Sequence, residues 1–189
     1  DNVRIQDGTG TAANLTLAAA ATNINTLNQT ATGGATTIDM GTNTLRLGTA
    51  GGILAGSGVS ALTIGSSVNQ GFLSAGGSTT NTAGSLYVTN NSGNTLTINS
   101  PVVNNGTGAV TLIKSGTGTV TLAGYTGAAY SGGTFINQGE LRVVTPNTAA
   151  TYALDIHTAG YLIGKFLEGR DDELAERGRS FLEHLKTPK

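Results

Sequence analysis

The feature that most constrains this chain is a short strand pattern that recurs through its first 143 residues. Each copy is four residues long and carries two apolar side chains two positions apart, which places both on one face of a β-strand. Most copies are followed within a few residues by Gly, Asn or Ser, which end a strand and supply turn conformations. Nine copies are present, at residues 14–17, 37–40, 44–47, 61–64, 85–88, 95–98, 109–112, 119–122 and 140–143.

Strands this short cannot form a wide sandwich by themselves, and the loops between them vary in length. Coiling removes both difficulties, because each turn of a solenoid stacks about 4.8 Å above the last and places Leu, Ile and Val on like residues. We therefore predict an all-β fold, a right-handed single-stranded parallel β-helix with three strands per turn. The predicted coils are 38–54, 62–88, 96–112 and 120–143, and residues before 38 add one or two less regular coils from Val3, Ile5, Leu15, Leu17, Ile24 and Leu27.

The composition agrees with stacked coils. Charged residues make up 11% of the chain and glycine supplies 29 residues, whereas an ordinary globular domain has roughly 25% charged residues. Like charges stacked on neighbouring coils repel, and tight corners require glycine. The alternatives are an antiparallel sandwich and a disordered Gly/Ser linker, but nine strand copies with preserved alternation are hard to obtain from a linker.

The near-neutral charge and the absence of cysteine narrow the function classes. A formal net charge of -1 gives no footprint for nucleic-acid binding, which needs clustered Lys and Arg. No window approaches the roughly 20 apolar residues that cross a bilayer, and no basic start marks a signal peptide. We expect a mature segment whose export signal and any anchor lie outside it. Zero Cys excludes disulfides and Cys-ligated zinc.

Residues 112–143, LIKSGTGTVTLAGYTGAAYSGGTFINQGELRV, resemble the passenger-associated transport repeat, also called the autotransporter-associated β-strand repeat. The resemblance lies in several short elements of this segment. They are Lys114, Gly116 and Gly118 in the opening, the strand 119–122, Gly124, the YSGGT segment 130–134, the pair 136–137, and Gly139 leading into Leu141 and Val143. The segments NTLRLG (43–48) and NTLTIN (94–99) look like degenerate coils that precede such repeats.

This resemblance implies a β-helix in the passenger of a type V secreted bacterial surface protein, outside the cell, where the repeat helps translocation and folding. The resemblance extends over residues 1–145. The family usually continues into a C-terminal membrane β-barrel, and nothing in these 189 residues can be that barrel. The chain is then a passenger fragment, or its coils are joined to something else.

The last part of the chain has a different composition. Of the 21 acidic and basic residues, 12 lie in residues 161–189. Leu167, Leu174 and Phe181 recur every seven positions, which is helical spacing, with Gly169 ending a first helix and Asp171 or Asp172 capping a second. We predict a domain at 1–150 and a charged amphipathic helical segment at 151–189. This tail is a cap on the open solenoid end, a self-association helix pair, or a sequence transplanted by engineering.

Catalytic chemistry has little support in the sequence. Polysaccharide-cleaving β-helices need clustered carboxylates with a nearby cation. The acids that the solenoid offers are Asp1, Asp7, Asp39, Glu140 and the boundary residue Asp155, and Asp39 and Glu140 are expected about four coils apart. We therefore assign no catalytic, cofactor-binding or metal-binding residues, no cofactor and no enzymatic activity.

The remaining candidates have ordinary interpretations. Lys114, Glu140 and Arg142 are expected to lie near one another on neighbouring coils, where an exposed ion pair is the ordinary explanation. His157 and His184 have no carboxylates at metal-ligand spacing, and the GTGTV segment at 116–120 is a turn rather than a phosphate loop. The leading hypothesis is a structural and adhesive rod at the bacterial surface, with a host or surface glycan or protein as a possible partner. The alternatives are a subunit that self-associates through coil ends or tail helices, and a polysaccharide-active enzyme.

Overall fold

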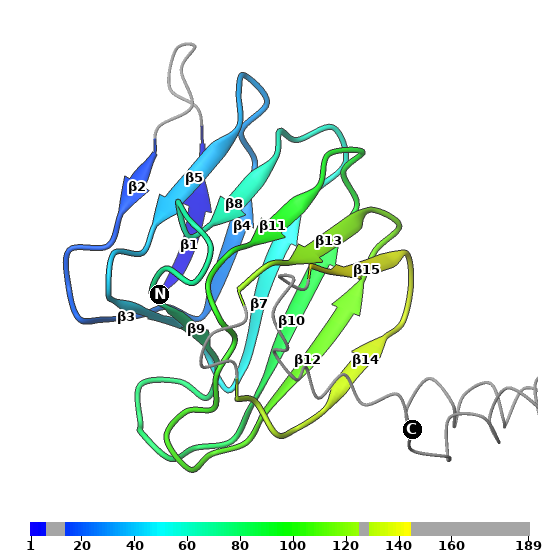
Figure 1. Cartoon of the computed structure of the whole chain (residues 1–189). Coiled ribbons are helices and arrows are strands. Elements are labelled where there is room, and N and C mark those ends of the chain that lie inside the picture. Colours follow the sequence, from blue (N-terminus) through cyan, green and yellow to red (C-terminus); the bar gives the residue numbers. More distant parts are fainter. Residues whose placement is uncertain (7–13, 125–128, 145–189) are drawn as a thin grey trace, which may run out of the picture. The chain divides into compact units, whose positions relative to one another are not determined.

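The strands of this chain wind in one direction around a single interior. The computed structural model describes residues 1–6, 14–124 and 129–144, which form a parallel β-solenoid of about five turns (Figure 1). This part of the chain belongs to the compact unit Asp1–Tyr152; the second unit, Ala153–Lys189, lies outside the described residues. The described residues contain strands, turns and bends but no helix.

Three parallel sheets make the walls of the solenoid, and each turn of the chain contributes to them in the same order. Sheet A contains β1 (Asn2–Ile5), β4 (Thr26–Gln29), β7 (Ala50–Ala55), β10 (Gly84–Asn90), β12 (Val110–Ser115) and β14 (Thr134–Ile136). Sheet B contains β2 (Leu15–Thr16), β5 (Thr36–Asp39), β8 (Leu62–Ile64), β11 (Leu96–Ile98), β13 (Thr119–Leu122) and β15 (Glu140–Val143). Sheet C contains β3 (Ala21–Asn23), β6 (Thr44–Arg46) and β9 (Phe72–Ser74), and isolated bridges at Val102 and Val103 continue it.

The core consists of apolar side chains stacked in register from coil to coil. In sheet B, Ile38 pairs with Ile64, Ile64 with Ile98, and Ile98 with Leu122. Ile64 and Ile98 are completely buried. Each such side chain contributes about 1.5–3 kcal/mol when it leaves water, and no single coil can bury its own apolar face. Stability therefore depends on neighbouring coils.

The outward face of sheet B shows the complementary pattern. Thr37, Thr63, Thr97 and Thr121 occupy successive positions of one column, and Arg142 follows on the last strand. β-Branched residues suit an extended strand, and their hydroxyls suit a face in contact with water. The alternation of Ile or Leu inside with Thr outside explains how a chain with few charges remains polar on its surface.

The predicted parallel β-helix with three strands per turn is confirmed. All nine predicted segments overlap observed strands, and 119–122 and 140–143 match β13 and β15 in full. The coils expected from residues before 38 also form, through β1 to β4.

The predicted fourth coil, 120–143, is wrong. Glu140 pairs with Thr119, so β15 lies one turn above β13 and begins the next coil. The strand that returns to sheet A is β14, which is not among the nine predicted segments. The helical tail predicted at 151–189, with its cap or self-association role, lies outside the described residues, and the domain boundary at 150 stays a prediction.

Across the described ranges, the structure contains no helix of the length and apolar character needed to cross a membrane.

The register can be tested with a pair of neighbouring substitutions in β11. We expect Ile98→Ala to lower the free energy of unfolding by about 2–5 kcal/mol, because it leaves a cavity in a stacked column. Thr97→Ala, on the outward face of the same strand, should cost less than about 1 kcal/mol. Urea unfolding followed by circular dichroism measures both. Equal losses would contradict the assigned inward and outward faces.

Candidate functional site

A lysine lies inside the solenoid where an apolar side chain would be expected. Lys114 is on β12, where it shares the inward alternation of Val110 and Leu112. Its register neighbours are Val88 on β10 and Ile136 on β14. Lys114 is completely buried, and lysines are almost never found in such a position without partners.

The partners of the Lys114 ammonium are three main-chain carbonyls. Nζ donates hydrogen bonds to the carbonyl oxygens of Ser115 at 2.8 Å, Gly116 at 2.7 Å and Gln138 at 2.9 Å. Ser115 ends β12 and Gly116 begins the turn after it, whereas Gln138 belongs to the corresponding turn of the next coil. We call this arrangement the lysine clip, because one side chain fastens two successive corners of the solenoid.

Electrostatics at the clip act in two directions. Burial lowers the pKa of the Lys114 side chain from its usual value, because the charged form loses its hydration. The three carbonyl acceptors favour the protonated form, since hydrogen bonds to a charged donor are stronger than neutral ones. The buried Lys114 ammonium thus supplies the hydrogen-bond donors that these corner carbonyls need.

The corner next to the clip can be built only with glycine. Gly116 has a φ of +79°, and a Cβ there would collide with the carbonyl oxygen of Asn90 on the coil below. Gly139 repeats this one coil later, with a φ of +71° and the carbonyl of Gly116 beneath it. The two glycines let the corners stack closely enough for one lysine to reach both.

A buried asparagine plays a similar part on the preceding corner. Asn90 is completely buried at the end of β10, and its Nδ2 donates to the carbonyls of Asn94 at 2.9 Å and Thr119 at 2.7 Å. The Gly118 N–H donates to the Asn90 carbonyl at 2.8 Å. Successive corners between sheets A and B are therefore joined by buried polar side chains that bond to main-chain groups.

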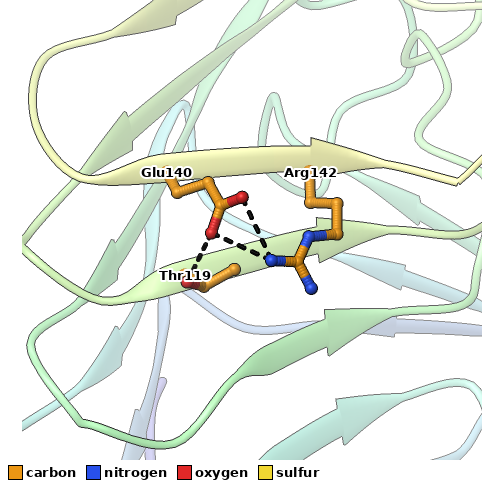
Figure 2. A network of polar contacts seen from close by, with 3 residues as sticks. All are labelled: Thr119, Glu140 and Arg142. Carbon is orange, nitrogen blue, oxygen red and sulfur yellow. Dashed lines mark hydrogen bonds and ion pairs between the residues drawn. The ribbon is translucent and has the colours of Figure 1, made fainter.

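An exposed polar network lies on the outer face of the same coils (Figure 2). Arg142 Nη2 lies 3.1 Å and 3.2 Å from the two carboxylate oxygens of Glu140, and the Thr119 hydroxyl donates to Glu140 Oε2 at 2.9 Å. The hydrogen bond from Thr119, followed by that from Arg142, lowers the pKa of the Glu140 carboxyl. Both side chains of the ion pair are more than half exposed, so water screens the pair and it contributes little to stability.

The expected grouping of Lys114 with Glu140 and Arg142 is only half right. Glu140 and Arg142 form the exposed ion pair, whereas Lys114 points into the core and bonds to carbonyls. The physical reason is strand parity, since a residue two positions after an inward Leu is itself inward. The sequence carried this signal in the alternation Val110, Leu112, Lys114.

The other residues considered for chemistry are not brought together. The Asp39 carboxylate accepts a hydrogen bond from the Gly41 N–H at 3.0 Å, and β5 is separated from β15 by three strands of sheet B. The GTGTV segment at 116–120 runs from a turn directly into β13, as predicted. Asp7, Asp155, His157 and His184 lie outside the described residues. No group of three or more His, Cys, Asp or Glu that could hold a metal ion occurs in the part of the chain that the structure describes.

The three stacked parallel sheets define the class of this protein, which is a parallel β-solenoid. The comparisons then place one segment more closely, because residues 112–143 match the family model of the passenger-associated-transport-repeat. This match begins at β12 and ends at β15, so it contains Lys114, Gly116, Gln138 and Gly139. The repeat family implies a secreted or cell-surface autotransporter passenger. No curated protein and no solved structure matches the chain.

The clip should be a measurable source of stability. We expect Lys114→Met, which keeps the length of the side chain but not its donors, to lower the free energy of unfolding by about 2–3 kcal/mol, because buried carbonyls lose a charged partner. The control Arg142→Met removes the exposed ion pair and should lower the free energy of unfolding much less, because water screens that pair. Chemical unfolding of the purified chain measures both, and an equal effect of the two changes would refute the clip.

The Glu140 network should show a dependence on acid. The folded-state pKa of Glu140 is lowered, so the stabilisation from its carboxylate is present above the unfolded-state pKa and is lost as the pH falls through the folded-state value. An NMR titration of the Glu140 carboxyl carbon should give a pKa below its ordinary value. In Thr119→Val the pKa should rise, and an unchanged titration would show that the hydroxyl does not hold it.

Proposed function

We propose that this chain is a non-enzymatic structural and adhesive segment in the passenger of a type V secreted bacterial surface protein. In this role it is a rigid β-helical rod outside the cell that holds other regions away from the surface. The observation that carries the proposal is the lysine clip inside the matched repeat, where Lys114 joins two successive coils. The lysine clip is suited to a structural role, because the Lys114 ammonium donates its hydrogen bonds to main-chain carbonyls of the protein itself.

The physical properties of the chain suit this role. In the proposed role the repeat helps translocation and folding outside the cell, and folding there requires the coils to stack in the correct register. Apolar columns stabilise any register that stacks Ile, Leu or Val. A buried ammonium is stable only in the register that brings three carbonyls within hydrogen-bond distance of it. We infer that the repeat fixes the register of its two coils, and that neighbouring coils can then add to a formed edge.

The proposal is tested by display at a bacterial surface. The chain is placed between an export signal and an outer-membrane anchor, and the surface-exposed, protease-resistant material is quantified. We expect the unchanged chain and Arg142→Met to give similar amounts and Lys114→Met to give several-fold less, because the unfolded passenger is degraded. Equal amounts from all three chains, or no resistant material from the unchanged chain, would contradict the proposed role of the repeat.

The same purified chain separates the proposal from an enzymatic function. A panel of pectin and alginate should show no release of reducing ends or unsaturated products, and activity above the blank would overturn the non-enzymatic assignment. Self-association through coil ends or tail helices stays a prediction and is compatible with a rod.

A further inference from the structure

The outward face of sheet A carries an aromatic feature that the rod function does not use. Strand register aligns Gly52 with Tyr87, Tyr87 with Ile113, and Ile113 with Phe135. These four residues, on β7, β10, β12 and β14, form what we call the aromatic column. Tyr87 is 42% exposed and Phe135 is 47% exposed. Large apolar side chains thus face solvent on successive coils.

On β10 and β12, short polar side chains flank the aromatic column on both sides. Ser85 and Thr111 pair on one side, and Thr89 and Ser115 pair on the other. The only charged residue of the four strands is Lys114, which is buried and faces the opposite way. The four strands therefore present an uncharged outward face, with hydroxyl-bearing side chains beside Tyr87 and Ile113 and with Ala50 and the exposed Leu54 in the flanking positions of β7.

We propose that the aromatic column binds an uncharged polysaccharide chain. A pyranose ring has apolar C–H faces and a rim of hydroxyls, so it can lie on an aromatic ring while its rim meets Ser and Thr side chains. The coils repeat at about 4.8 Å, close to the length of one sugar unit in an extended chain. A polysaccharide running along the solenoid axis would meet one residue of the column at each coil, with Ile113 between the rings of Tyr87 and Phe135.

Two features of the column favour this ligand over others. An anionic polymer or a nucleic acid needs Lys or Arg to neutralise it, and these strands present none on their outward face. Gly52 adds no side chain to the column on the coil next to Tyr87, so a ligand that continues in that direction meets main chain there. The inference rests on the proposed adhesive function and names the class of its partner.

The test uses the full chain in native affinity electrophoresis with three neutral glucans: hydroxyethyl cellulose, laminarin and soluble starch. At least one should retard the unchanged chain, and carboxymethyl cellulose, its charged counterpart, should retard it less than hydroxyethyl cellulose does. The double change Tyr87→Ser with Phe135→Ser should weaken the retardation about tenfold or more, since each lost 1.4 kcal/mol of ring contact is a factor of ten. The matched control Phe72→Ser removes an exposed aromatic from sheet C and should bind like the unchanged chain.

Circular dichroism accompanies each variant. Where the serine variant does not fold, Tyr87→Leu with Phe135→Leu keeps apolar side chains in the column while removing the rings, and the same loss of binding is expected. Absence of retardation by all three glucans in a folded chain overturns the proposal, as does retardation that survives loss of both rings. Concentration-dependent dimerisation that disappears with the rings, without glucan binding, would assign the column to a second copy instead. None of these results affects the surface-display test of the rod.

Discussion

The structure depends on in-register stacking of side chains between successive coils. Each sheet-B strand contributes one or two apolar residues, too few to form a core within one coil, yet Ile38, Ile64 and Ile98 lie directly above one another. The interior is thus built from columns that run along the solenoid axis. A shift of one residue in a sheet-B strand would exchange its apolar and polar side chains between the core and the surface. The alternation therefore fixes the register of the stack.

Stacked coils transfer the difficult part of the fold to the corners. Strand residues satisfy their main-chain groups with the coils above and below, but a corner exposes carbonyls toward the interior, where an unpaired polar group is costly. This chain uses two devices there. Glycines with positive φ, such as Gly116 and Gly139, let corners stack closely, and buried Asn90 and Lys114 supply donors to the carbonyls that remain. The high glycine content of the sequence follows from the first of these needs.

The sequence predicts the parts of the fold that repeat, and fails where the repeat is weak. The pairs at 119–122 and 140–143 define β13 and β15, because two apolar residues two apart mark a half-buried strand. β9 and β14 were missed because each has two adjacent large apolar residues, Phe72 with Leu73 and Phe135 with Ile136, of which parity turns one outward. Missing β14 caused the misplaced fourth coil. Local alternation gives strands, whereas the assignment of strands to coils requires the return path of the chain.

The inward position of Lys114 could also be predicted from strand alternation. Lysine on a strand is usually read as exposed, although alternation in β12 places Lys114 with Val110 and Leu112. What the sequence could not supply was the identity of its partners, because the Gln138 carbonyl comes from the next coil and depends on the length of the intervening loop. The ion pair of Glu140 and Arg142 can be predicted from local geometry alone, because the two residues are two positions apart on one face of a strand.

The polar clip also explains why a passenger repeat would keep an unfavourable residue in its core. An apolar side chain at position 114 could pack against Val88 in more than one coil register, since columns of Ile, Leu and Val are nearly interchangeable. A buried ammonium is strongly disfavoured in every register except the one that brings the Ser115, Gly116 and Gln138 carbonyls together. The lysine therefore adds discrimination between registers to its contribution to stability. Apolar stacking alone supplies little of this discrimination, because one Ile, Leu or Val column accepts another.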